Sequence, residues 1–215
     1  MIFRNRAQAA HLLARKLAAD YANKHPLVLA IPRGAVPMGR LIADSLGGEL
    51  DVMLVHKLGH PAQPELAIGA IDESGNLFLT SFAADVDASY LEMEKQRQLE
   101  VLRSRRLQYT PLRAPVDLRG RIVIVVDDGI ATGSTMIAAL RAARAQAPQQ
   151  LVAAVAVASP EAEQAISLEA DATVCLIMPA KFEAVGQFFA DFTQVEDAEV
   201  VAALAQEKVG PSSSD

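Results

Sequence analysis

The chain has 215 residues, of which 51% are hydrophobic and 21% charged, and its formal net charge is −6 at pH 7. This length and composition fit one globular domain with a substantial core. The acidic balance disfavours a broad electrostatic surface for nucleic acid or for an anionic membrane, so a small anionic ligand would need a local site.

Helix and strand patterns alternate along the first part of the chain. Apolar residues recur at three- and four-residue spacing from Arg4 to Asn23, which predicts an amphipathic helix. The aliphatic run Leu27 to Ile31 predicts a buried strand, and a loop at Pro32-Arg33-Gly34 leads into a helix that ends at Gly47-Gly48. A second strand is expected from Asp51 to His56.

A long excursion separates these elements from the second half of the chain. Residues 57–82 include two prolines and a turn sequence at Ser74-Gly75-Asn76, flanked by apolar residues. This composition predicts a flexible loop or a hairpin. The stretch from Asp87 to Tyr109 has a strongly helical pattern.

Strands and helices then alternate again. The expected elements are a strand from Ile122 to Val126, a helix from Ser134 to Ala145, a strand from Leu151 to Ala158, a helix from Pro160 to Ala170 and a strand from Thr173 to Met178. Aliphatic strands that alternate with helices are typical of parallel strands buried on both faces. The sequence therefore predicts an α/β fold with a doubly wound, mainly parallel sheet flanked by helices.

The composition changes at residue 179. Four of the seven phenylalanines lie beyond this point, at Phe182, Phe188, Phe189 and Phe192. We expect residues 179–207 to form a hood or cap near the sheet edge, in which most of these aromatic rings pack into the core. Residues 208–215 are expected to form a disordered tail, which leaves one domain over residues 1–207.

The stretch VIVVDDGIATGST, from Val123 to Thr135, places two aspartates at the end of a buried strand. Ligands of α/β sheets usually bind beyond the carboxyl ends of the strands, so Asp127 and Asp128 lie where a site is expected. Successive strand residues face opposite sides, which allows the two carboxylates to take different roles. Close carboxylates in a poorly solvated cleft raise each other's pKa unless a cation or hydrogen-bond donors stabilise the charged forms, and a sugar diol with Mg²⁺ would do both.

The loop after the aspartates fits a phosphate group. It leads into a helix whose first amides lack internal partners and whose dipole favours an anion. Thr132, Ser134 and Thr135 add hydroxyl donors, and Gly133 allows close backbone approach. A diol site next to a phosphate site describes a ribose 5-phosphate, although each residue taken singly also fits a capped helix end. A Walker A loop is excluded because Ser134 stands where that motif needs lysine.

VIVVDDGIATGST closely resembles the phosphoribosyl pyrophosphate signature of type I phosphoribosyltransferases. The stretches LAIPRGAVPMG, VHKLGHPAQPELAIGAI and MPAKFEAVGQFFADFTQVEDAEV are similar to a widespread bacterial branch of that family. The resemblance covers most of the chain. It implies the type I phosphoribosyltransferase fold with a small hood region.

The resemblance also implies a role for each residue of the motif. Asp127 and Asp128 would contact the ribose hydroxyls, take part in catalysis and meet Mg²⁺ that the substrate holds. The loop that binds the substrate and its 5′-phosphate would comprise Gly129, Ala131, Thr132, Gly133, Ser134 and Thr135.

Two further segments would bind the pyrophosphate. Arg33 and Gly34 would form its loop, where Gly34 permits an unusual backbone conformation and Arg33 supplies charge; the alternative is a turn with a solvated arginine. Similar enzymes place an arginine-lysine pair after the second strand, but this chain has His56-Lys57, so Lys57 alone would reach the pyrophosphate or else be a solvated lysine. Glu65 would lie in the flexible lid of the family, as a proton-transfer group or as a surface charge.

Ala131 bears on the choice of substrate. Family members that act on 6-oxopurines have an aspartate at this position, so the alanine disfavours such a base and is more like adenine- or uracil-type transferases. The expected function is Mg²⁺-dependent transfer of the 5-phosphoribosyl group from phosphoribosyl pyrophosphate to a nitrogenous base, with release of pyrophosphate, in nucleotide salvage. The alternative is a regulator that binds phosphoribosyl pyrophosphate without turnover.

The sequence also bears on the protein's surroundings. Cys175 is the single cysteine, no apolar run reaches membrane-spanning length, and the first residues lack a signal-peptide pattern. We expect a cytoplasmic homodimer whose partners are phosphoribosyl pyrophosphate and a small base, with neither nucleic acid nor a membrane among them.

Overall fold

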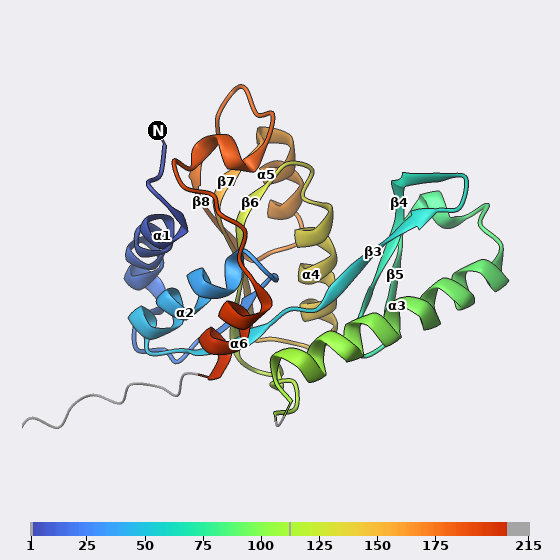
Figure 1. The fold of residues 1–215 in the computed structure, drawn as a ribbon, viewed down its shortest axis with the longest axis horizontal. Helices are drawn as coiled ribbons and strands as arrows, with labels where there is room; N and C mark the ends of the chain where they lie inside the picture. Colours follow the sequence, from blue (N-terminus) through green and yellow to red (C-terminus); the bar gives the residue numbers. More distant parts are fainter. Residues whose placement is uncertain (1, 112, 206–215) are drawn as a thin grey trace, which may run out of the picture.

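A five-stranded parallel sheet forms the centre of the protein (Figure 1). The structure is a computed structural model that describes residues 2–111 and 113–205. The strand order of the sheet is β2-β1-β6-β7-β8, and every neighbouring pair runs parallel. The strands are β1 (Leu27–Ala30), β2 (Glu49–Val52), β6 (Ile122–Ile130), β7 (Gln150–Ala158) and β8 (Ala172–Ile177). The predicted doubly wound α/β fold is confirmed.

Helices cover both faces of this sheet because its strands are apolar on both sides. The covering helices are α1 (Arg6–Tyr21), α2 (Ala35–Leu46), α4 (Ser134–Ala145) and α5 (Pro160–Ser167). On β6, Ile124 and Val126 belong to the core under α1 and α2. Val123 and Val125 belong to the core under α4 and α5. The two-residue period of the strand therefore assigns each side chain to a layer.

Strand β6 is longer than predicted. The predicted strand ended at Val126, but the observed one continues to Ile130 because it keeps pairing with β7, with Asp127 opposite Val155 and Gly129 opposite Val157. The two aspartates are thus part of a strand whose alternation still holds. Asp128 shares the face of Val126, and Asp127 takes the opposite face.

The predicted second strand, from Asp51 to His56, is divided between two sheets. Val52 ends β2 opposite Ala30, the last residue of β1, and Val55 begins a strand that pairs with Asp72 in the antiparallel sheet. The segment gives no break at this point because residues 51–54 are buried and residues 55–56 are partly buried. Only the pairing partners separate the two strands.

Residues 55–109 form a second unit, called the arm below, that projects from the main sheet (Figure 1). It contains the antiparallel strands β3 (Val55–His60), β4 (Gln63–Asp72) and β5 (Leu77–Leu79), the short helix η1 (Ser81–Ala83) and the long helix α3 (Ala88–Tyr109). The segment at 57–82 is therefore mostly hairpin, and its predicted turn occurs at Gly75, whose φ of 88° lies in the left-handed region.

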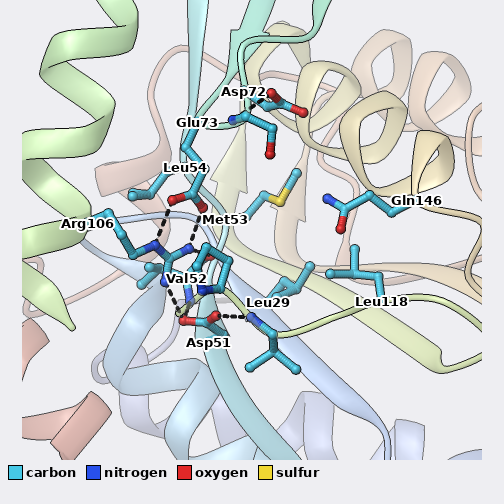
Figure 2. A pocket seen from close by; sticks show the side chains of 13 residues that line it. Leu29, Asp51, Val52, Met53, Leu54, Asp72, Glu73, Arg106, Leu118 and Gln146 are labelled. Atoms are coloured by element: carbon cyan, nitrogen blue, oxygen red, sulfur yellow. Dashed lines mark hydrogen bonds and ion pairs between the residues drawn. The ribbon is translucent and has the colours of Figure 1, made fainter. Parts of the chain in front are cut away.

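A buried ionic network joins the arm to the main sheet (Figure 2). Figure 2 shows the Arg106 guanidinium of α3 between the carboxylates of Asp51 and Glu73. Arg106 Nη1 lies 2.7 Å from Asp51 Oδ1, and Nη2 of Arg113 lies 2.9 Å from the same oxygen. The Asp51 side chain is only 1% exposed. Its second oxygen accepts the backbone N–H of Val116, so the carboxylate is fully engaged.

The C-terminal segment packs against the N-terminal one. Residues 179–205 contain the short helix η2 (Val185–Phe188) and the helix α6 (Asp197–Ala205). Phe3 forms a parallel bridge with Phe189, and their rings lie 5.3 Å apart. The predicted tail at 208–215 lies outside the described residues.

In the part of the chain that the structure describes, no helix combines the length and apolar character needed to cross a membrane.

The junction yields a stability prediction. Arg106→Met removes the guanidinium and leaves Asp51 and Glu73 without their shared cation, which should lower the free energy of unfolding by roughly 3 kcal/mol. Chemical denaturation measures the effect. Arg103→Ala, an exposed change on the same helix, is the matched control and should stay close to the parent. Equal stability of Arg106→Met and the control would show that the network does not hold the arm.

Candidate functional site

The candidate site lies at the carboxyl edge of the main sheet. The loop after β1 carries Arg33 and Gly34, the end of β6 carries Asp127 and Asp128, and Ser159 follows β7. Parallel strands bring their carboxyl ends to one edge, so these three segments meet although they are far apart in sequence. In the loop after β1, the Pro32–Arg33 peptide bond is cis.

Asp128 is paired with an arginine that the sequence analysis did not single out. Arg6 Nε, at the start of α1, donates to Asp128 Oδ2 at 2.7 Å, and both side chains are mostly buried. No motif marks Arg6, because it lies 122 residues from Asp128 and becomes its neighbour only when α1 packs on the sheet. The helix itself begins where Asn5 accepts the N–H of Gln8, a usual N-cap.

Arg6 also holds the C-terminal segment. Its Nη1 donates to the carbonyl oxygen of Thr193 at 2.7 Å, and its guanidinium carbon lies 3.9 Å from the centre of the Phe192 ring. A cation over an aromatic face is attracted by the ring quadrupole. One guanidinium therefore connects α1, β6 and the residues after η2.

Gly34 lies directly against Asp128. A Cβ on Gly34 would be 2.3 Å from Asp128 Oδ2 and 3.1 Å from Arg6 Nε, so only glycine fits beside this ion pair. The unusual backbone conformation predicted at Gly34 is wrong, because φ is −55° and ψ −37°, ordinary right-handed values. Close approach, and not a left-handed backbone, is what requires glycine at this position.

Asp127 lies in a different environment from Asp128. It takes the α4 side of β6, and its Oδ1 accepts the backbone N–H of Asp128 at 2.8 Å. Desolvation by the surrounding protein and, after it, the negative charge of Asp128 raise the pKa of Asp127 well above its ordinary value. The predicted asymmetry between the two acids follows: Asp128 is matched by a cation, whereas Asp127 bears the cost of burial.

The loop from Ala131 to Gly133 exposes its polar groups at the start of α4. Gly133 has φ of 75° and caps the helix without a side-chain hydrogen bond. The hydroxyls of Thr132 and Ser134 lie 3.0 Å apart, and the carbonyl of Ala131 accepts the Ser159 hydroxyl at 2.7 Å. Hydroxyls and helix-end amides therefore converge at one exposed place, as an anion site requires. Thr135, in the first turn, is also exposed.

Gly129 is needed for packing of the C-terminal segment. A Cβ there would lie 2.4 Å from Val185 Cγ1 and 2.8 Å from Val157 Cγ1. The glycine of the motif thus lets η2 lie against β6. Its predicted role in binding the substrate remains a prediction.

Three cavities surround the site, and they separate residues that were expected to act together. Arg33 lines one of about 390 Å³ between the loop after β1, α3 and α6. Lys57 lines another, of about 180 Å³, between the arm sheet and α4, which also includes Ser134. A third, of about 480 Å³, lies between Ala131, α5 and Phe182. Arg33 and Lys57 therefore line different cavities.

Glu65 lies within the bounds of β4, and its side chain falls outside the described part of the structure. The expected role of Glu65 in proton transfer accordingly stays a prediction.

The carboxylates near the loop suit a Mg²⁺ ion that the substrate also holds. Among the described residues, no group of three or more His, Cys, Asp or Glu side chains could hold a metal ion. Mg²⁺ commonly uses one or two carboxylates together with substrate phosphates and waters. Within the described part of the chain, no cationic side chain forms an ion pair with Asp127 as Arg6 does with Asp128, so the Asp127 carboxylate suits that arrangement.

The family model and the curated relatives that match this chain indicate the same protein family. Residues 1–191 match the family model described as the phosphoribosyl transferase domain. Two curated proteins of Mycobacterium tuberculosis, strains CDC 1551 / Oshkosh and ATCC 25618 / H37Rv, are each 42% identical over 206 residues and are provisionally named phosphoribosyl transferases. The match covers 94% of this chain but 46% of theirs, so the chain spans about half the length of these curated relatives.

Two solved structures are also similar. A crystal structure of a Thermus thermophilus protein is 45% identical, with a TM-score of 0.87 over 95% of this chain and 98% of that one. A protein of Aquifex aeolicus shares the fold alone, with a TM-score of 0.52, 14% identity and coverage of 95% and 86%.

The raised pKa of Asp127 yields a pH prediction. An acid whose pKa is higher folded than unfolded binds more protons when folded, so it lowers stability as the pH rises from its unfolded pKa, near 3.8, through its folded pKa. Asp127→Asn removes this penalty. The variant should be more stable than the parent at pH 7, and the difference should vanish near pH 4. Denaturant titrations at both pH values test this, and a variant less stable at pH 7 would contradict it.

Proposed function

The chain belongs to the type I phosphoribosyltransferase family, and on that premise we propose that it transfers the 5-phosphoribosyl group from phosphoribosyl pyrophosphate to a nitrogenous base. The observation that carries the proposal is the arrangement at the end of β6. There two carboxylates in different environments precede an exposed helix start at which the Thr132 and Ser134 hydroxyls lie 3.0 Å apart. A diol-binding group beside a phosphate-binding group suits a ribose 5-phosphate.

The 5′-phosphate would bind at the loop before α4. The backbone amides at the start of the helix and the Thr132 and Ser134 hydroxyls supply donors, and the helix dipole favours the anion. Gly133 holds the left-handed conformation that turns the chain into the helix. The loop would therefore fix the sugar at its phosphate end.

The two aspartates would orient the ribose. Asp128 is held in place by Arg6 and lies against Gly34, so its position is set before the substrate arrives. Asp127 holds a proton more readily than an ordinary aspartate in the ligand-free protein. A diol and a cation at its carboxylate would favour the charged form and offset that burial.

Transfer would proceed by electrostatics and positioning, with no covalent nucleophile. As the bond from the anomeric carbon to pyrophosphate breaks, positive charge develops on the ribose next to Asp127 and Asp128, and negative charge develops on the leaving group near Arg33. Mg²⁺, when bound with the substrate, would add neutralising charge at the departing pyrophosphate. The base nitrogen attacks the carbon that is losing its leaving group.

The acceptor base would occupy the cavity of about 480 Å³ beside the loop. Phe182, Glu161 and Glu183 line it together with Ala131 and Thr132. The Phe182 ring offers a flat apolar surface for a base, whereas Phe188 and Phe189 are buried in the core. Ala131 has no group that binds or releases a proton, which supports an acceptor other than the 6-oxopurines.

A panel assay separates catalysis from regulation. The protein is incubated with phosphoribosyl pyrophosphate, Mg²⁺ and individual bases while pyrophosphate release is measured. Release that depends on one base supports the transferase and identifies the acceptor, whereas tight binding without release under any base supports the non-catalytic regulator. A cytoplasmic homodimer that acts in nucleotide salvage, without nucleic acid or membrane partners, stays a prediction.

The phosphate loop yields a binding prediction. In the parent, a ligand at a concentration of about 100 times its Kd should stabilise the fold by about 2.7 kcal/mol, which is measured as a higher Tm. Gly133→Val forces a branched residue into the left-handed region and fills the loop, so it should abolish the shift caused by phosphoribosyl pyrophosphate. Asp128→Asn, as a separate variant, should also abolish this ligand-induced shift.

The matched control is Gly120→Val, a glycine with φ of 68° and no atom near its Cβ position, away from the site. This variant should lose stability for the same backbone reason and yet keep the ligand-induced shift. If Gly133→Val keeps the shift as Gly120→Val does, the loop is not the phosphate site.

A further inference from the structure

The cavity of about 390 Å³ beside the candidate site is lined from three separate parts of the chain. Pro32 and Arg33 come from the loop after β1. The C-terminal turn of α3 and the start of α6, which pack against each other, provide the rest: Arg105, Gln108, Tyr109 and Asp197 (Figure 1). The arm therefore reaches the loop expected to bind pyrophosphate.

Arg33 is held loosely in this cavity. Its Nη1 lies 3.7 Å from Glu196 Oε2 and 3.8 Å from Asp197 Oδ1, which is too long for a hydrogen bond. Its side chain is 36% exposed. Partly solvated ion pairs of this kind contribute little to stability, so the guanidinium can exchange these carboxylates for a stronger anion.

Asp197 is a fixed part of the cavity wall. Tyr109 Oη donates to its Oδ1 at 2.9 Å and Gln108 Nε2 donates to its Oδ2 at 3.0 Å. The hydrogen bond from Tyr109, then the one from Gln108, lower the pKa of Asp197, and the charges of Arg33 and Arg105 lower it further. Its carboxylate oxygens both have donors on α3.

Arg105 is presented to the cavity by its neighbour Arg106. Because Arg106 is locked between Asp51 and Glu73, the rotation of α3 is fixed, and Arg105 is turned about 100° around the helix from it. Arg105 is exposed. Among the described residues, none forms an ion pair or a hydrogen bond with its side chain.

No other side chain supplies positive charge at this cavity within the part of the chain described. Burial and, after it, the Arg105 charge lower the pKa of His56, which disfavours the charged imidazole. Lys57 lines the cavity on the α4 side. Arg33 and Arg105 are thus the two cations that line this cavity, whose lining carboxylate, Asp197, is already hydrogen-bonded, while Glu196 lies 3.7 Å from Arg33.

We propose that Arg105 is a second substrate-binding cation, which together with Arg33 binds a diphosphate group in this cavity. The inference rests on the proposed function and adds a residue of the arm to its site. Two planar guanidinium groups suit the many oxygens of a diphosphate because each can donate two parallel hydrogen bonds. The diphosphate belongs either to phosphoribosyl pyrophosphate or to free pyrophosphate.

Arg105→Ala tests the proposal against Arg103→Ala, an exposed arginine on the same helix that lies outside the cavity. The Kd of inorganic pyrophosphate, of phosphoribosyl pyrophosphate and of ribose 5-phosphate is measured by calorimetry with Mg²⁺ present. We expect Arg105→Ala to weaken both diphosphate ligands about tenfold, equivalent to ~1.4 kcal/mol, and to leave ribose 5-phosphate unchanged. Arg105→Lys should weaken them less, and Arg103→Ala should match the parent.

The outcomes distinguish a failure of the proposed function from a failure of this inference. A parent that binds none of the three ligands overturns the proposed function and this inference with it. A parent that binds them, with Arg105→Ala unchanged for both diphosphates, overturns the inference alone. Equal weakening of ribose 5-phosphate would also overturn it, because Arg105 would then act on the whole site and not on the diphosphate.

Discussion

The buried carboxylate of Asp51 is the interaction on which the arrangement of the two units depends. It lies on the edge strand β2 and accepts hydrogen bonds from Arg106 of α3, from Arg113 and from the backbone of Val116. An unpaired charge at 1% exposure would be very costly, so loss of a donor to this carboxylate should destabilise the fold. The pairing with Arg106 fixes the position and rotation of α3, which carries Arg105 to the cavity beside the candidate site.

A second connection runs through Arg6. This residue neutralises Asp128, lies over Phe192 and bonds to Thr193, so the N-terminal helix, the central strand and the C-terminal segment share one guanidinium. Gly34 and Gly129 make the same packing possible, since a Cβ on either would collide with its neighbours. The two ends of the chain thus meet at the acidic end of β6, where Arg6 supplies the partner of Asp128.

Local sequence determined much of this protein. Helix α4 was predicted from Ser134 to Ala145 and has those bounds, because its apolar period and the preceding glycine are local features. The parallel sheet and the position of Asp127 and Asp128 at its carboxyl edge were also predictable, since buried parallel strands are aliphatic on both faces. The thirteen residues from Val123 to Thr135, together with three further stretches, were enough to indicate the family, which the match over residues 1–191 confirms.

Only the tertiary structure decided which distant side chains meet. The extension of β6 to Ile130 depends on its pairing with β7, and the division of residues 51–56 depends on which strands lie beside Val52 and Val55. The pairing of Arg6 with Asp128 spans 122 residues. Local periodicity reports the face on which a residue lies, but not what lies opposite. That depends on how helices and strands pack against each other, which is a property of the whole chain.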